Sequence, residues 1–179
     1  MAVEIIAPEI QLVKTIDDGA GTDLGGTDVT LGTELWYNVS FQNIGTDNAL
    51  NTIIYDVLPK NVNLLSDASG DFEVDLPTGV TVLSYEEPSD ANDNQGILTL
   101  SVDDDLVREI TEGGGGLYNI RFKVQIATDC NQLVDICSNV IENTAYATYV
   151  GERGGAVIEN QPSFSGIDCL LYTSDAADE

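Results

Sequence analysis

The chain has 179 residues, 42% of them hydrophobic, and carries 31 acidic against 6 basic side chains, a formal net charge of −25 at pH 7. This length suffices for one domain with its own core, and the ordinary apolar content argues against wholesale disorder. The negative charge repels nucleic acid and anionic membrane surfaces, so we expect neither as a partner. The sequence contains no histidine and no apolar run long enough to cross a membrane.

The first ten residues, MAVEIIAPEI, lack the basic region and the long apolar region of a signal peptide. Residues 1–8 are interpreted as a linker or as the end of a preceding module. We expect the export signal upstream of this sequence, which places the protein outside the cell or on its surface.

Short extended segments separated by turn signals follow one another along the chain, with no long helical pattern. Asp103–Thr111 is expected to form a turn of helix, and the acidic or glycine-rich stretches between the extended segments are expected to be loops. The expected strands are Glu9–Ile16, Leu35–Gln42, Thr52–Val57, Val62–Leu65, Val80–Tyr85, Ile97–Val102, Leu117–Ile126, Val140–Val150 and, at an edge, Ala156–Glu159. Seven to nine such strands predict an all-β fold, an antiparallel β-sandwich.

Two of these segments show the alternation of a half-buried strand. Leu35, Tyr37, Val39 and Phe41 alternate with polar or outward residues, and Leu117–Ile126 repeats the pattern. Turn residues follow the first of them before the next strand begins, so the two strands are expected to be neighbours in space.

An ordered set of short motifs spans the chain from about Pro8 to Gly151. The motifs are Leu31-Gly32, Tyr37, Asn43-Ile44-Gly45, Asp56-Val57-Leu58-Pro59 and Asn143-Thr144-Ala145. In this order they resemble the conserved repeat of bacterial surface proteins called domain of unknown function eleven. The segment CNQLVDICSNVIENTAYATYVG resembles the variant found in large secreted proteins of Bacteroidetes-type bacteria.

This resemblance implies an immunoglobulin-like sandwich over residues 9–151 and a structural or adhesive role without a catalytic site. Neighbouring repeats of the same chain are the implied partners, with surface glycans or proteins as further candidates. Residues 152–168 would form an edge strand or a linker to the next module.

The last eleven residues, Cys169–Glu179, read CLLYTSDAADE. This segment resembles the translation of a transposase adapter used in sequencing libraries. We interpret it as a non-native tail and leave it out of the fold prediction, as is done for a fusion scar. The chain stays strongly acidic without it.

Cys130 and Cys137 are six residues apart in a loop. In an exported protein the pair is expected to form a disulfide that stabilises by about 2–3 kcal/mol. Two reduced, buried thiols are the alternative. A zinc site lacks the further ligands it needs, and the spacing is not that of a Cys-x-x-Cys redox motif.

The acidic loop DDGAGTDLGGTD offers oxygen ligands for calcium, the one cofactor that we consider. Its candidate ligands are Asp17, Asp18, Asp23 and Asp28, with glycines that let backbone carbonyls turn inward. The alternative is a solvated run of charges. Neither this loop nor Glu86–Gly96 matches the spacing of an EF-hand.

Lys14 shares a strand face with Ile10 and Leu12, so its amine is predicted to point into the core. By the same parity, Asp56 and Asn143 point inward from two other strands. A buried amine, a protonated carboxyl and an amide could form an intramolecular isopeptide bond, an arrangement that resembles some surface-adhesin domains. The alternatives are a plain Lys14–Asp56 ion pair or a lysine that reaches out to water.

Trp36 lies on the outward side of its strand and is the candidate for stacking on a sugar ring. The alternative is an aromatic side chain that covers the core or a neighbouring module. A calcium- or carbohydrate-binding accessory module is therefore the second functional hypothesis. An enzyme is not expected, because the sequence contains no histidine, no G-x-S-x-G nucleophile elbow and no phosphate-binding loop.

Overall fold

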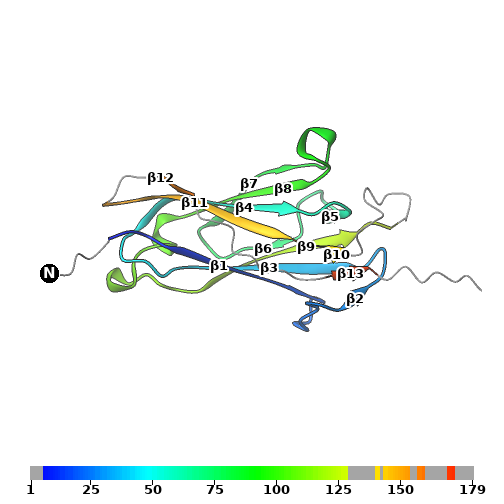
Figure 1. The fold of residues 1–179 in the computed structure, drawn as a ribbon, viewed down its shortest axis with the longest axis horizontal. Helices are drawn as coiled ribbons and strands as arrows, with labels where there is room; N and C mark the ends of the chain where they lie inside the picture. The colour runs from blue at the N-terminus through cyan, green and yellow to red at the C-terminus, as the bar shows by residue number, and fades with distance from the viewer. Residues whose placement is uncertain (1–5, 129–139, 142, 154–156, 160–168, 172–179) are drawn as a thin grey trace, which may run out of the picture.

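The computed structural model describes residues 6–128, 140–141, 143–153, 157–159 and 169–171. In these residues the chain forms an elongated sandwich in which two antiparallel sheets face each other (Figure 1). This confirms the predicted all-β, immunoglobulin-like antiparallel sandwich.

The first sheet has the order β1-β3-β9-β5, with the short β6 also paired to β9. All of its pairings are antiparallel, and β3 is paired along most of its length on both sides. Its strands are β1 (Ile10–Asp17), β3 (Glu34–Asn43), β5 (Val62–Leu64), β6 (Val74–Asp75) and β9 (Tyr118–Ile126).

The second sheet has the order β12-β11-β4-β8-β7 and is also antiparallel. Its strands are β4 (Ala49–Leu58), β7 (Val80–Glu86), β8 (Gly96–Val102), β11 (Thr144–Gly151) and β12 (Val157–Glu159). The central strand β4 pairs with β11 on one side and with β8, the partner of β7, on the other.

Short elements complete the chain between and beside the sheets. A small sheet has the order β10-β13-β2, in which β13 pairs antiparallel to β10 and parallel to β2. Its strands are β2 (Asp28–Val29), β10 (Val140–Ile141) and β13 (Cys169–Leu171), and the 3-10 turns are η1 (Asp90–Asn92), η2 (Asp104–Leu106) and η3 (Ile110–Glu112).

The structure differs from the predicted elements at several places. The predicted strand Val140–Val150 is divided, so that β10 joins the small sheet while β11 joins the second sheet. The predicted helical turn in Asp103–Thr111 becomes the two short 3-10 turns η2 and η3, each closed by two i→i+3 hydrogen bonds. The segment between β5 and β7, where a loop is predicted, contains the short strand β6. Phe72 beside β6 packs edge-on against Tyr85, with 5.4 Å between the two ring centroids.

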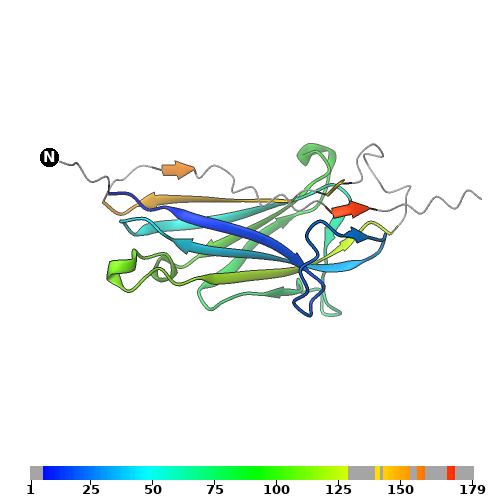
Figure 2. The same ribbon diagram turned by 60° about the horizontal axis from the view of Figure 1, so that its bottom comes forward.

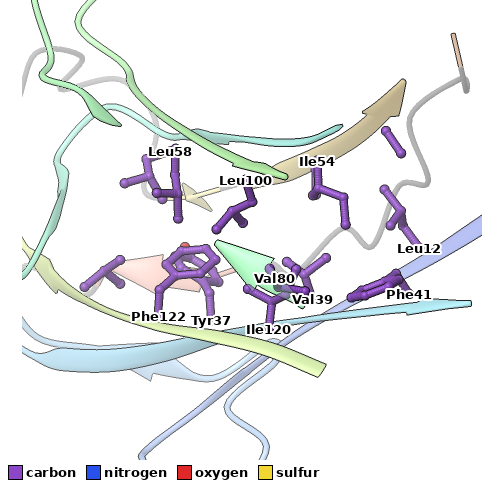
Figure 3. Packing of buried hydrophobic residues seen from close by; sticks show 14 of the residues in the cluster. Leu12, Tyr37, Val39, Phe41, Ile54, Leu58, Val80, Leu100, Ile120 and Phe122 are labelled. Atoms are coloured by element: carbon purple, nitrogen blue, oxygen red, sulfur yellow. The ribbon is translucent and has the colours of Figure 1, made fainter. Parts of the chain in front are cut away.

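One contiguous core fills the space between the two large sheets (Figure 3). Tyr37, Phe41 and Phe122 project from the first sheet toward Ile54 and Leu100 of the second, and all five are buried. Alternate positions of each strand contribute to this core, as the period of two predicted. Burial of side chains of this size is the main stabilising term of the fold.

The first and the last long strands, β1 and β11, belong to different sheets but lie beside each other (Figure 2). The Ile10 backbone N–H donates to the Tyr149 hydroxyl at 3.3 Å, and Tyr149 is itself buried. This contact ties the two sheets together where the chain enters the sandwich.

We expect Leu100→Ala to lower the free energy of unfolding by about 2–5 kcal/mol, because the cavity left in a packed core collapses only in part. Leu83→Ala is the matched control: it deletes the same atoms from a side chain on β7 that is 57% exposed, and the loss should stay within about 0.5 kcal/mol. Urea unfolding followed by Trp36 fluorescence measures both. Equal losses would contradict a core between these sheets.

Candidate functional site

Lys14 lies near the middle of β1 with its side chain directed between the sheets. β1 alternates buried and exposed residues, and Lys14 occupies a buried position in that alternation, with 3% of its surface exposed. The parity prediction for Lys14 is therefore confirmed. The strand pairing with β3 fixes the direction of the side chain, because a shift by one residue would turn it to solvent.

Asp56 and Asn143 approach from the opposite sheet. Asp56 on β4 stands opposite Ala145 of β11, and Asn143 lies two residues before Ala145, immediately ahead of the strand. Inward-facing residues with this offset are diagonal neighbours on one face of a sheet, within reach of each other's side chains. Asp56 is fully buried and Asn143 is 5% exposed.

The three side chains meet in an apolar and aromatic setting. The Lys14 amine donates to Asp56 Oδ2 and lies 4.7 Å from the centre of the Tyr37 ring and 5.4 Å from that of Phe122. The sequence placed both rings in the core, but their contact with the amine depends on pairing between β1, β3 and β9. These two rings are the part of the site that periodicity alone does not reveal.

The polar atoms of the cluster are incompletely hydrogen-bonded. Among the described residues, Asp56 Oδ1 and both amide atoms of Asn143 have no hydrogen-bond partner of good geometry. Even so, the Asn143 side chain lies close enough to Asp56 to lower the pKa of that carboxyl. Leaving a buried polar atom unpaired costs about 1–3 kcal/mol, so this cluster destabilises the core as it stands.

Burial shifts the protonation of both charged groups toward their neutral forms. Removal from water lowers the pKa of the Lys14 amine to about 8, although the Asp56 carboxylate beside it acts in the opposite direction. The same desolvation raises the pKa of Asp56 against the effects of Lys14 and Asn143. A neutral amine beside a neutral carboxyl is therefore accessible in the folded state. Such an amine is a nucleophile, and the amide of Asn143 is an acylating group within the same cluster.

The four aspartates proposed for calcium lie in or beside one loop, and three of them accept hydrogen bonds within the domain. Asp17 pairs with Arg121 at 3.1 Å and accepts from Asn38 at 2.7 Å. Asp18 and Asp23 accept backbone N–H groups of their own loop, and Asp28 starts β2. In the part of the chain that the structure describes, no three acidic or thiol side chains form a group that could hold a metal ion.

Trp36, the candidate for glycan stacking, is partly covered. The guanidinium of Arg121 lies 4.9 Å from the centre of the Trp36 ring. Gly19 of the preceding loop approaches the same side chain so closely that an added Cβ would lie 2.9 Å from Trp36 Cδ1. The indole thus packs against Arg121 and Gly19 of its own domain, and glycan stacking on Trp36 stays a prediction.

A polar network that the sequence did not predict closes the sandwich near residue 45. Asp47, which is fully buried, accepts the backbone N–H of Arg153 at 2.9 Å. The Arg153 guanidinium reaches Glu109 at 3.1 Å and Glu112 at 3.4 Å, while Asn48 accepts from the Glu109 N–H. These residues are far apart in the sequence, and no motif connects them. The network connects separate loops at this end of the sandwich.

Cys130 and Cys137 lie outside the described residues, so the disulfide between them stays a prediction. Within the described residues, no helix has the length and apolar content needed to cross a membrane.

The chain matches no known family model and no curated protein sequence. Its fold is similar to that of several solved bacterial surface proteins. One is BcpA, the major pilin subunit of Bacillus cereus, at 15% identity and a TM-score of 0.53, covering 91% of this chain and 40% of BcpA.

A second similar structure is the major pilin SpaA of Corynebacterium diphtheriae, at 16% identity and a TM-score of 0.51, covering 92% of this chain and 36% of SpaA; its structure points to a modular pilus assembly with stabilising isopeptide bonds. A third is a cohesin module of a family 33 glycoside hydrolase from Clostridium perfringens, at 9% identity and a TM-score of 0.53, covering 93% of this chain and all of the module. The chain thus spans about two fifths of the pilins that it matches. At these identities the likeness establishes the fold.

We expect the free energy of unfolding of Lys14→Met to fall as the pH rises from about 4 toward neutrality. In this variant Asp56 stays buried without its cation, and desolvation keeps its folded pKa above the unfolded value. In that window the folded state holds a proton that the unfolded state has lost, so raising the pH favours unfolding. Urea unfolding at a series of pH values measures the slope.

The control for this slope is the double variant Lys14→Met/Asp56→Leu, which removes the buried acid as well. It should lose the additional pH dependence and regain up to about 3–5 kcal/mol at neutral pH, the usual cost of an unpaired buried charge. Other carboxylates titrate in both variants, so the difference between the two curves isolates Asp56. Parallel curves would show that Asp56 is not buried in the core.

Proposed function

We propose that this chain is a non-catalytic structural module of a large secreted or cell-surface bacterial protein, in which it stands beside other modules of the same chain. The observation that carries this proposal is the position of the Lys14–Asp56–Asn143 cluster. Its side chains comprise an amine, a carboxyl and an amide, yet at most 5% of the surface of each is exposed. A cluster sealed between two sheets can act on the fold itself but cannot receive a substrate.

The fold comparison and the sequence support the same assignment. The similar pilins are subunits of surface fibres, and this chain corresponds to less than half of each. The motifs from Leu31 to Ala145 resemble a repeat of bacterial surface proteins, which agrees with a module that occurs in a series. A disulfide between Cys130 and Cys137 would suit the oxidising environment of an exported protein.

The surface charge suits a module that stays soluble outside the cell and repels its own copies. A net charge of −25 disfavours nonspecific association and attracts cations. A calcium- or carbohydrate-binding module is the competing assignment. The positions of the loop aspartates and of Trp36 favour it less, because both are engaged within the domain.

We expect the chain to resist mechanical unfolding when pulled from its two ends. The chain is placed in a polyprotein between copies of an immunoglobulin-type reference module, and single-molecule force spectroscopy records the order of unfolding. The reference modules should yield before or together with this domain, because a continuous core and long antiparallel ladders must break together.

Extension of this domain well below the force of the reference module would contradict a load-bearing role. A calcium-dependent rise in melting temperature, or saturable binding on a glycan array that Trp36→Ala abolishes, would favour the competing assignment. Arg121→Ala serves as the control for the glycan measurement, because it uncovers the Trp36 ring without removing it.

A further inference from the structure

The core of the sandwich contains an amine, a carboxyl and an amide in one connected group. Lys14 contacts Asp56, and Asp56 in turn lies against Asn143. Lys14 belongs to the first sheet and Asp56 to the second, and Asn143 lies immediately before β11 of the second sheet. The side chain of Lys14 therefore crosses the space between the sheets, where only apolar contacts are otherwise expected.

Two features of this group are unfavourable if it is only an ion pair. An ion pair in a dry core loses more hydration energy than its attraction restores unless the remaining polar atoms are hydrogen-bonded. Here Asp56 Oδ1 and both amide atoms of Asn143 lack such partners among the described residues. A well-satisfied ion pair would also not require an amide at Asn143. The unpaired amide is the observation that the ion-pair interpretation leaves unexplained.

We propose that Lys14 and Asn143 become joined by an intramolecular amide bond once folding has brought both side chains to Asp56. This inference rests on the proposed function and specifies how such a module would resist load. Asp56 is the proton carrier of the reaction rather than a bonding partner, because it contacts the amine on one side and the amide on the other.

The reaction is balanced without any added reagent. A proton passes from the Lys14 ammonium to Asp56, and the neutral amine attacks Cγ of Asn143 while the Asp56 carboxyl donates a hydrogen bond to Oδ1. Asp56 then transfers a proton from the attacking nitrogen to Nδ2. The Cγ–Nδ2 bond breaks, the Nζ–Cγ bond forms, and one ammonia molecule leaves. No group is oxidised or reduced, and Asp56 ends in the protonation state in which it began the attack.

The surroundings favour each part of this reaction. The rings of Tyr37 and Phe122 shield the amine from water, and removal from water favours its neutral, nucleophilic form. The product replaces a buried charge and an unpaired amide by one secondary amide beside Asp56, so the number of unsatisfied polar atoms falls.

The bond would also change the path of force through the chain. Lys14 is in the first long strand and Asn143 precedes the last one, so tension would pass from β1 directly to β11. All residues between them would be protected from extension. In the force experiment, Asn143→Ala should unfold with roughly 45 nm of additional contour length at about 3.5 Å for each residue, an event that the unsubstituted chain should not show.

The decisive measurement is the intact mass of the purified, reduced and denatured chain. We expect a mass below the sequence value by one ammonia molecule, and a peptide pair after digestion that links Lys14 to Asn143. Lys14→Arg, Asn143→Ala and Asp56→Asn should each restore the full mass, because they remove the nucleophile, the acceptor and the proton carrier. Lys60→Arg is the matched control and should keep the loss, since Lys60 is a surface lysine paired with Asp93 at 3.3 Å.

Each other result overturns part of the inference. A mass equal to the sequence value in the folded protein excludes the bond, and circular dichroism of that same sample verifies the fold. Loss of one water molecule would make Asp56 the acceptor in place of Asn143. An unchanged mass together with high mechanical resistance would refute the bond and leave the proposed function intact, whereas an unchanged mass with low resistance would refute both.

Discussion

The packing of two apolar sheet faces against each other is the constraint on which the rest of this structure depends. It determines which side of each strand is buried and so decides that the amine of Lys14 is enclosed with Tyr37 and Phe122. A lysine at a strand edge would reach water, but one in the middle of β1 cannot. The chemistry of the core is therefore a consequence of strand register.

The burial of Lys14 and its polar neighbours affects both the stability of the fold and the role that we propose for it. Protein cores usually exclude ionisable groups, because desolvation of a charge costs several kcal/mol. Here a lysine, an aspartate and an asparagine are retained in the core, where they destabilise an unreacted fold. The proposed covalent bond between the sheets would turn that liability into a permanent connection. At one end of the sandwich, the ion pairs of Arg153 with Glu109 and Glu112 connect separate loops.

The candidate binding features behave as parts of the scaffold. Asp17 holds Arg121, and Arg121 in turn covers Trp36, so an apparent calcium ligand and an apparent sugar platform belong to one surface cluster. Asp18 and Asp23 accept N–H groups that the tight loop would otherwise leave exposed. These loop carboxylates already accept hydrogen bonds from the local backbone, and calcium binding by them stays a prediction.

By itself the sequence determined the sandwich class, most of its strands, and the inward direction of Lys14, Asp56 and Asn143, because a period of two is a local property of the chain. It did not divide Val140–Val150 between two sheets, and it did not connect Asp47 with Arg153 or bring Tyr37 and Phe122 to the lysine amine. Those outcomes depend on which strands pair and in what register, which is decided by long-range packing. Only the tertiary structure placed the amine, the carboxyl and the amide in one cluster, since parity gives a side chain its face of the sheet but not its neighbours across the core.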